Sequence, residues 1–183
     1  MAYFRVSEAR QAFQRSYPNR ALTASAAKTA LQAETGRRGA PRFDIFLSHS
    51  TDDAVTIAGI KAILERDGSK VYVDWIDDPQ LDRSRVSAAT ADVLRGRMRA
   101  SASLMYVSSK SSSASRWMPW ELGYFDGMRP GKVAILPIVE ASDSEYTGIE
   151  FVGLYPTVER DALGRAQVRL SPTATRTAGQ FRA

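Results

Sequence analysis

Along the middle of the chain, short runs of hydrophobic residues alternate with longer amphipathic segments. The apolar runs predict four strands, at Phe43–Leu47, Lys70–Trp75, Ala102–Val107 and Val133–Val139. Apolar residues at helical spacing predict helices between them, over Asp53–Asp67, Ser84–Arg99 and from about Ser115 to Gly127. Strands that alternate with helices indicate an α/β domain whose parallel sheet is flanked by helices.

The first 41 residues do not follow this alternation. Apolar residues between positions 6 and 17 fall at near-helical spacing, and residues 21–34 are rich in alanine, so two short helices are expected. The segment from Gly36 to Pro41 has the composition of a linker. We therefore expect residues 1–41 to form a helical arm and linker outside a domain that spans 42–170 and folds without them.

The C-terminal region has weaker patterns. One helical turn is expected over Gly148–Leu154, and the segments Tyr155–Val158 and Ala166–Leu170 predict a β-hairpin. Residues 171–183 are polar and lack periodicity, which is typical of a disordered tail.

The net charge of +5 belongs to the N-terminal arm. Residues 1–40 contain seven basic and two acidic side chains, whereas basic and acidic side chains balance in the rest of the chain. A basic arm can bind nucleic acid or anionic lipid, and its composition also resembles that of an organellar transit peptide. No nucleic-acid recognition motif accompanies the charge, so we favour a solvated helix or an element that docks a protein partner.

Composition narrows the chemistry further. The chain has no cysteine, which excludes disulfides, thiolate metal sites and cysteine nucleophiles. Its one histidine, His49, makes a zinc site of ordinary composition improbable, and a Ser-His-Asp triad would have to run through that residue. We expect no metal and no bound cofactor. No apolar run approaches the ~18 residues that span a bilayer, and no secretory pattern follows Met1, so we expect a cytoplasmic protein without membrane contact.

Polar residues gather at the predicted carboxyl ends of the strands, where open α/β sheets bind ligands. The sequence has neither the glycine-rich turn of a dinucleotide-binding Rossmann fold nor a P-loop, so a nucleotide would have to be held by other groups. The serine-rich segment Ser108–Ser115 could hold phosphate, or it could be only a flexible loop. The residues at these ends are Ser48-His49-Ser50, Asp74-Trp75, Ser108–Ser115 and Glu140.

Four segments in this order resemble the TIR (Toll/interleukin receptor) family. The resemblance covers about residues 42–140 and is most specific in the run from Trp117 to Glu121. It implies a flavodoxin-like parallel sheet. The segments are Phe43-Asp44-Ile45-Phe46-Leu47-Ser48-His49-Ser50, Val71-Tyr72-Val73-Asp74-Trp75, Ser103-Leu104-Met105-Tyr106-Val107-Ser108 with Ser115-Arg116-Trp117-Met118-Pro119-Trp120-Glu121-Leu122-Gly123, and Val133–Val139.

The resemblance implies one of two functions. Some TIR domains are scaffolds that stack in signalling, whereas others cleave NAD as hydrolases or cyclases in immune or antiphage defence. In the enzymatic branch the glutamate of the W-x-x-x-E segment is catalytic, which here is Glu121. NAD is then the substrate rather than a cofactor, and self-association through the domain is implied. The resemblance suggests a substrate-binding set of Ser48, His49, Asp74, Trp75, Ser115 and Trp117.

This chemistry suits a chain with few reactive side chains. Nicotinamide is already cationic in NAD and leaves without a proton, so no general acid is needed. The oxocarbenium-like transition state requires a nearby carboxylate and groups that hold the ribose hydroxyls. An N-glycosidase acting on other nucleotides would use the same carboxylate, and the sequence does not separate the two.

The same residues also have structural interpretations. A glutamate near a helix start often caps the helix or faces solvent, and a tryptophan such as Trp117 often belongs to the core. His49 and Asp74 could serve only to order their loops. The acidic loop from Ile76 to Ser84 departs from the shorter, glycine-containing loop expected of TIR domains, so no substrate contact is assigned to it.

Overall fold

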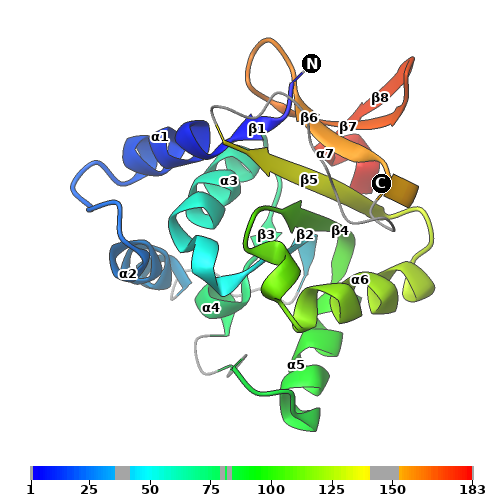
Figure 1. Ribbon diagram of the computed structural model, residues 1–183, viewed down its shortest axis with the longest axis horizontal. Helices are drawn as coiled ribbons and strands as arrows, with labels where there is room; N and C mark the ends of the chain where they lie inside the picture. Colours follow the sequence, from blue (N-terminus) through cyan, green and yellow to red (C-terminus); the bar gives the residue numbers. More distant parts are fainter. Residues whose placement is uncertain (1, 36–41, 79–80, 82–83, 141–152, 183) are drawn as a thin grey trace.

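A central, mostly parallel sheet with helices on both faces forms the fold (Figure 1). The computed structural model describes residues 2–35, 42–78, 81, 84–140 and 153–182. In this part of the chain the strand order is β3-β2-β4-β5-β6-β7-β8, and β1 pairs with β5 off this path. The strands are β1 Phe4–Arg5, β2 Phe43–Ser48, β3 Val71–Tyr72, β4 Ser101–Ser108, β5 Val133–Val139, β6 Thr157–Arg160, β7 Ala166–Ser171 and β8 Ala174–Thr177.

The helices connect and cover these strands. Within the described residues none of them is both long and apolar enough to cross a membrane. They are α1 Val6–Ser16, α2 Ala24–Thr35, η1 Thr51–Asp53, α3 Ala54–Arg66, α4 Asp74–Asp77, α5 Ala88–Arg99, η2 Ser112–Ala114, α6 Trp117–Met128 and α7 Ala178–Arg182.

The four predicted strands all form, and the expected α/β fold is confirmed. Strands β1 to β6 pair in parallel, and β7 and β8 extend the sheet in antiparallel fashion. The strand β3 is shorter than predicted because the chain turns into α4 at Asp74, where the Asp77 side chain accepts a hydrogen bond from the backbone N–H of Val73 (2.9 Å). The predicted hairpin is present as β6 and β7, whereas most of the helical turn expected at 148–154 lies outside the described residues.

Successive residues of the central strands point into two separate cores. On β4, Met105 and Val107 pack with α1 and α3, while Leu104 and Tyr106 pack with α5 and α6. This period of two is what a strand buried on both faces requires. The sheet therefore presents both of its faces to helices and leaves its carboxyl edge to loops.

The N-terminal segment is part of the first core. Both predicted helices form, but Phe4 pairs with Ile138 of β5, and Ala9 and Phe13 are fully buried in the cluster that contains α3. The expectation that this segment lies outside the domain is corrected here, because an amphipathic helix is stabilised mainly by burying its apolar face, which in α1 includes Ala9 and Phe13. The boundary predicted at residue 41 falls in 36–41, outside the described residues.

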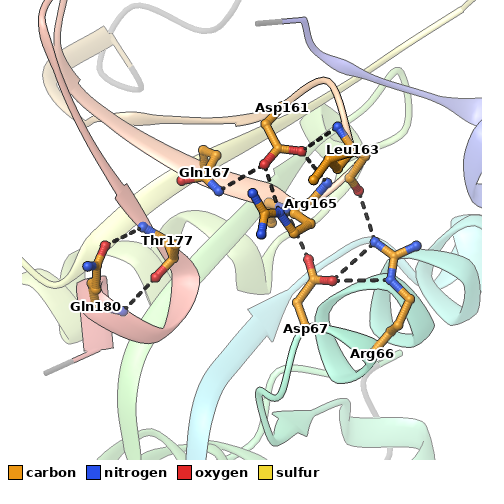
Figure 2. A network of polar contacts seen from close by, with 10 residues as sticks. Arg66, Asp67, Asp161, Leu163, Arg165, Gln167, Thr177 and Gln180 are labelled. Atoms are coloured by element: carbon orange, nitrogen blue, oxygen red, sulfur yellow. Dashed lines mark hydrogen bonds and ion pairs between the residues drawn. The ribbon is translucent and has the colours of Figure 1, made fainter.

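The C-terminal tail also differs from the expectation of disorder. Residues 174–177 form β8 against β7, and α7 buries Ala178 and Phe181 in the first core. Figure 2 shows the cap of α7. The backbone N–H of Thr177 donates to Oε1 of Gln180 (3.0 Å), and the backbone N–H of Gln180 donates to the Thr177 hydroxyl (3.2 Å). A single phenylalanine in a polar segment has no periodicity, so its burial could not be inferred from the pattern.

Substituting Gly59 by alanine should destabilise the fold. A Cβ at this position of α3 would lie 1.8 Å from the carbonyl oxygen of Ala9 in α1, so α1 would have to move. Overpacking of this kind costs about 1–3 kcal/mol, and we expect the thermal midpoint to fall by several degrees. Gly96→Ala in α5 is the matched control, since a Cβ there meets nothing within 4 Å and alanine favours the helix by about 0.5–1 kcal/mol. Equal midpoints for the two variants would contradict the close helix contact.

Candidate active site

Glu121 and Ser48 meet at the carboxyl end of the sheet. Ser48 is the last residue of β2, and Glu121 lies on the second turn of α6. The Ser48 hydroxyl donates a hydrogen bond to Oε2 of Glu121 at 2.6 Å, and both side chains have no exposed surface. A carboxylate buried among apolar residues is costly unless it is hydrogen-bonded. The arrangement therefore holds one acidic group in a fixed position near the helix start, where the helix dipole favours negative charge.

His49 is held in one orientation beside this pair. Its Nε2 accepts a hydrogen bond from the indole N–H of Trp75 (2.8 Å), which can only donate. Its Nδ1 therefore carries the proton and donates to the carbonyl of Leu47 (2.7 Å). Asp74 Oδ1 lies 3.2 Å from Nε2 and accepts the backbone N–H of Trp75 (2.8 Å). These contacts hold the imidazole in place between Trp75, Asp74 and the Leu47 carbonyl.

A small pocket opens next to His49. Its volume is about 140 Å³, and Trp117 closes one side with only 5% of its surface exposed. Ser115 also lines the pocket, and its hydroxyl accepts the backbone N–H of Met118 near the start of α6 (3.3 Å). Glu121 does not line the pocket, but Ser48, which bonds it, directly precedes the lining residue His49. The lining residues are His49, Ser50, Thr51, Asp52, Ser84, Ala114, Ser115, Arg116 and Trp117.

The serine-rich loop after β4 is tied to the loop after β2. One carboxylate oxygen of Asp53 accepts hydrogen bonds from the hydroxyls of Ser109 and Ser111, each at 2.6 Å. Ser112 donates in turn to the carbonyl of Ser109 (2.8 Å). Because these hydroxyls already donate hydrogen bonds to the Asp53 carboxylate, the centre of the loop is poorly suited to bind phosphate. These hydrogen bonds therefore join the loop after β4 to the segment after β2, with Asp53 as the shared acceptor.

The acidic segment after β3 is anchored to α5. Asp78 is buried, accepts two bonds from Arg97 at 2.7 Å and accepts a third from the Tyr72 hydroxyl at 2.8 Å. Burial, followed by the carboxylates of Asp74 and Asp78, raises the pKa of Tyr72 well above its ordinary value, so this hydroxyl stays a donor. Asp78 is therefore used within the chain.

The structure brings the seven predicted site residues to one edge of the sheet. Ser48 contacts Glu121, while Asp74 and Trp75 orient His49 and do not line the pocket. Sequence reasoning missed the shared acceptor Asp53 and the lining residue Arg116. No local pattern marks Asp53, whose serine partners lie more than fifty positions further along the chain.

Two curated proteins resemble this chain. A protein of Bacillus cereus (strain MSX-D12), named "Probable 3′ cyclic ADP-D-ribose synthase ThsB′", is 54% identical over 122 residues, which is 66% of this chain and 63% of the relative. A protein of Cytobacillus dafuensis, named "Putative cyclic ADP-D-ribose synthase TIR2", is 34% identical over 83 residues, which is 45% of this chain and 22% of the relative. No protein-family model matches the chain.

These matches agree with the fold and with the position of the site. They cover less than two thirds of the first relative and less than a quarter of the second. The mostly parallel sheet, with the Trp117–Glu121 segment beginning α6 at its carboxyl edge, is the arrangement that the sequence resemblance implied. The two relatives thereby support the resemblance to bacterial TIR proteins that the sequence indicated.

Proposed function

We propose that this chain cleaves NAD at the bond between nicotinamide and ribose, with Glu121 as the catalytic carboxylate. The observation that carries the proposal is the hydrogen bond from Ser48 to Glu121, which holds a buried acidic group beside a pocket at the carboxyl edge of the sheet. A preorganised negative charge stabilises the oxocarbenium-like transition state that forms when cationic nicotinamide leaves. The names of the two relatives support NAD as the substrate.

The neighbouring residues have matching roles in this proposal. The Ser115 hydroxyl offers a polar contact for a ribose hydroxyl, His49 forms part of the pocket wall, and Trp117 offers an aromatic face to the sugar or the base. Arg116 lines the same pocket and provides a guanidinium group for a phosphate of the substrate. Asp74 and Trp75 act through His49, so we describe them as positioning residues.

The pocket must widen before NAD can bind. Its volume of about 140 Å³ is below the roughly 300–1,000 Å³ of pockets that enclose ligands of drug size. Glu121 has no exposed surface, so a substrate reaches it only when a covering side chain moves. Trp117 is the candidate for this movement, since it lines the pocket and lies four residues before Glu121 on the same helix.

We further propose a cyclic product and a role in antiphage defence signalling. Both relatives are named as cyclic ADP-D-ribose synthases, and the first name specifies the 3′ cyclic form. Cyclisation follows when a hydroxyl of the ADP-ribose unit, rather than water, attacks the ribose carbon that nicotinamide has left. The attacking hydroxyl loses its proton as the new glycosidic bond forms, so atoms and charge balance.

The test is incubation of the purified chain with NAD, followed by chromatography with mass detection of nicotinamide and of the ADP-ribose product. We expect nicotinamide to be released together with a product lighter than linear ADP-ribose by one water. If the only product were linear ADP-ribose, the proposal of NAD cleavage would stand and the proposal of a cyclic product would be refuted. Absence of nicotinamide release over a wide range of protein concentrations would favour a signalling scaffold.

Replacing Ser48 by alanine should lower kcat for NAD cleavage by about 10–100-fold with little change in KM. The variant removes the hydroxyl that donates to Oε2 of Glu121, and a hydrogen bond to a charged group is worth about 1.5–3 kcal/mol. Steady-state kinetics of Ser48→Ala, Glu121→Gln and the double variant measure the coupling. If Ser48 acts through Glu121, the double variant is no slower than Glu121→Gln, whereas additive losses would show an independent role.

We expect catalysis to depend on self-association through the TIR domain. A site that is closed in a single copy and must widen for its substrate can be stabilised in the open form by a neighbouring chain. The measurement is nicotinamide release per molecule across serial dilution, with size-exclusion chromatography at the same concentrations. A rate per molecule that stays constant while the protein elutes as a monomer would contradict this expectation.

A further inference from the structure

A second cavity lies between α1, α3 and the turn that joins β6 to β7. Its volume is about 370 Å³, which is within the range of small-molecule sites. Its apolar lining includes Phe4, Ala12 and Ile63. It shares no lining residue with the pocket beside His49, so it is a separate feature of the fold.

Three arginines and one glutamate also line this cavity, which gives its charged lining a net charge of +2. Arg160 pairs with Glu8 (3.0 Å) through one Nη, while its Nε is buried and has no hydrogen-bond partner within the described part of the chain. Arg15 makes a long contact from Nε to the Gln11 carbonyl (3.4 Å) and forms no ion pair among the described residues. A buried guanidinium N–H without an acceptor is unfavourable. With three arginines against one glutamate, the cavity offers a positively charged lining to an anion.

The cavity wall opposite α1 is formed by the β6–β7 turn, which is closed by hydrogen bonds. Figure 2 shows Asp161 closing the β6–β7 turn, where it accepts the backbone N–H groups of Leu163 (2.8 Å) and Arg165 (2.9 Å). The bond from the Arg165 backbone is the main cause that lowers the pKa of Asp161, and the Arg165 side chain adds to it. Acidification therefore weakens this closure only when the pH falls below the ordinary range of an aspartate.

The same turn is fastened to α3. Arg66 donates to the Gly164 carbonyl (3.1 Å) and to the Asp67 carboxylate (3.1 Å), while Asp67 accepts the backbone N–H of Ala166 (3.1 Å) (Figure 2). Two cavity walls that are distant in sequence are thus held together before any ligand arrives. Such preorganisation reduces the entropic cost of binding.

We propose that this cavity binds a small organic phosphate of about mononucleotide size. Arg15 and Arg160 provide guanidinium donors for the phosphate, which suits the planar, forked geometry of arginine. The apolar side chains Phe4, Ala12 and Ile63 receive the less polar part of the ligand. Because α1 forms one wall and packs on α3, a bound ligand would stabilise the docking of the N-terminal segment.

The test is isothermal titration calorimetry of the full chain with adenosine monophosphate, inorganic phosphate and adenosine. We expect adenosine monophosphate to bind saturably and adenosine to bind at least about tenfold more weakly, since it lacks the charge. Arg15→Gln should weaken adenosine monophosphate by about tenfold or more. Arg10→Gln is the matched control, because Arg10 is exposed on the same helix and does not line the cavity.

A second variant, Ala12→Trp, fills the cavity without changing its charge and should abolish the binding, with the thermal midpoint measured alongside. Arg15→Gln keeps the test decisive if Ala12→Trp fails to fold, because Arg15 is exposed. Unchanged affinity for adenosine monophosphate in Arg15→Gln would place the binding elsewhere and overturn the proposal. So would the absence of saturable binding by all three probes at millimolar concentrations. Neither result depends on whether the chain cleaves NAD.

Discussion

Replacing Glu121 with glutamine should reduce nicotinamide release from NAD by about 10²–10³-fold while leaving the fold intact. Glutamine has nearly the same shape and can still accept the hydrogen bond from Ser48, so the packing around α6 is kept. What the variant loses is the negative charge that would face the developing cation. The measurement is the initial rate of nicotinamide release, with the thermal midpoint recorded for the same preparation.

Glu140→Gln is the matched control for this prediction. Glu140 follows β5 at the same edge of the sheet and is half-buried, but it does not line the pocket beside His49. We expect its rate to stay close to that of the unaltered chain. If Glu121→Gln retained most of the activity, the catalytic carboxylate would have to be another residue.

Removing residues 1–35 should unfold the chain or lower its thermal midpoint by a large amount. The deletion takes away β1 and α1, and it exposes the surface of α3 and β5 that Phe4 and Phe13 cover. Burial of a phenylalanine side chain contributes about 1.5–3 kcal/mol. The loss of two is therefore comparable with the roughly 5–15 kcal/mol of a typical domain. Circular dichroism during heating measures the effect.

Single substitutions on α1 separate packing from charge in this prediction. Phe13→Ala should destabilise by about 3–5 kcal/mol, as deletion of a buried aromatic side chain usually does. Arg10→Ala on the exposed face should change stability by no more than about 0.5 kcal/mol. A truncated chain with the midpoint of the full chain would show that the segment is an appendage, as its sequence alone suggested.

Local sequence patterns predicted some elements of this fold and missed others. The strands β2, β4 and β5 and the helices α3 and α6 were predictable because their periodicity records which face each residue buries. The resemblance of the W-x-x-x-E segment to the enzymatic branch of the TIR family indicated Glu121, and the spacing of four places Trp117 on the same helix face. The shortening of β3 was not predictable, since the turn at Asp74 depends on the Asp77 carboxylate.

The sequence by itself determined the order of strands and helices, the carboxyl edge as the ligand edge, and Glu121 as the candidate carboxylate. Only the tertiary structure decided that Ser48 bonds Glu121 across 73 positions of sequence and that α1 belongs to the core. The reason is physical. Periodicity reports how a segment faces its surroundings, but a hydrogen bond or a close helix crossing such as that at Gly59 depends on where distant segments meet, which the folded chain alone determines.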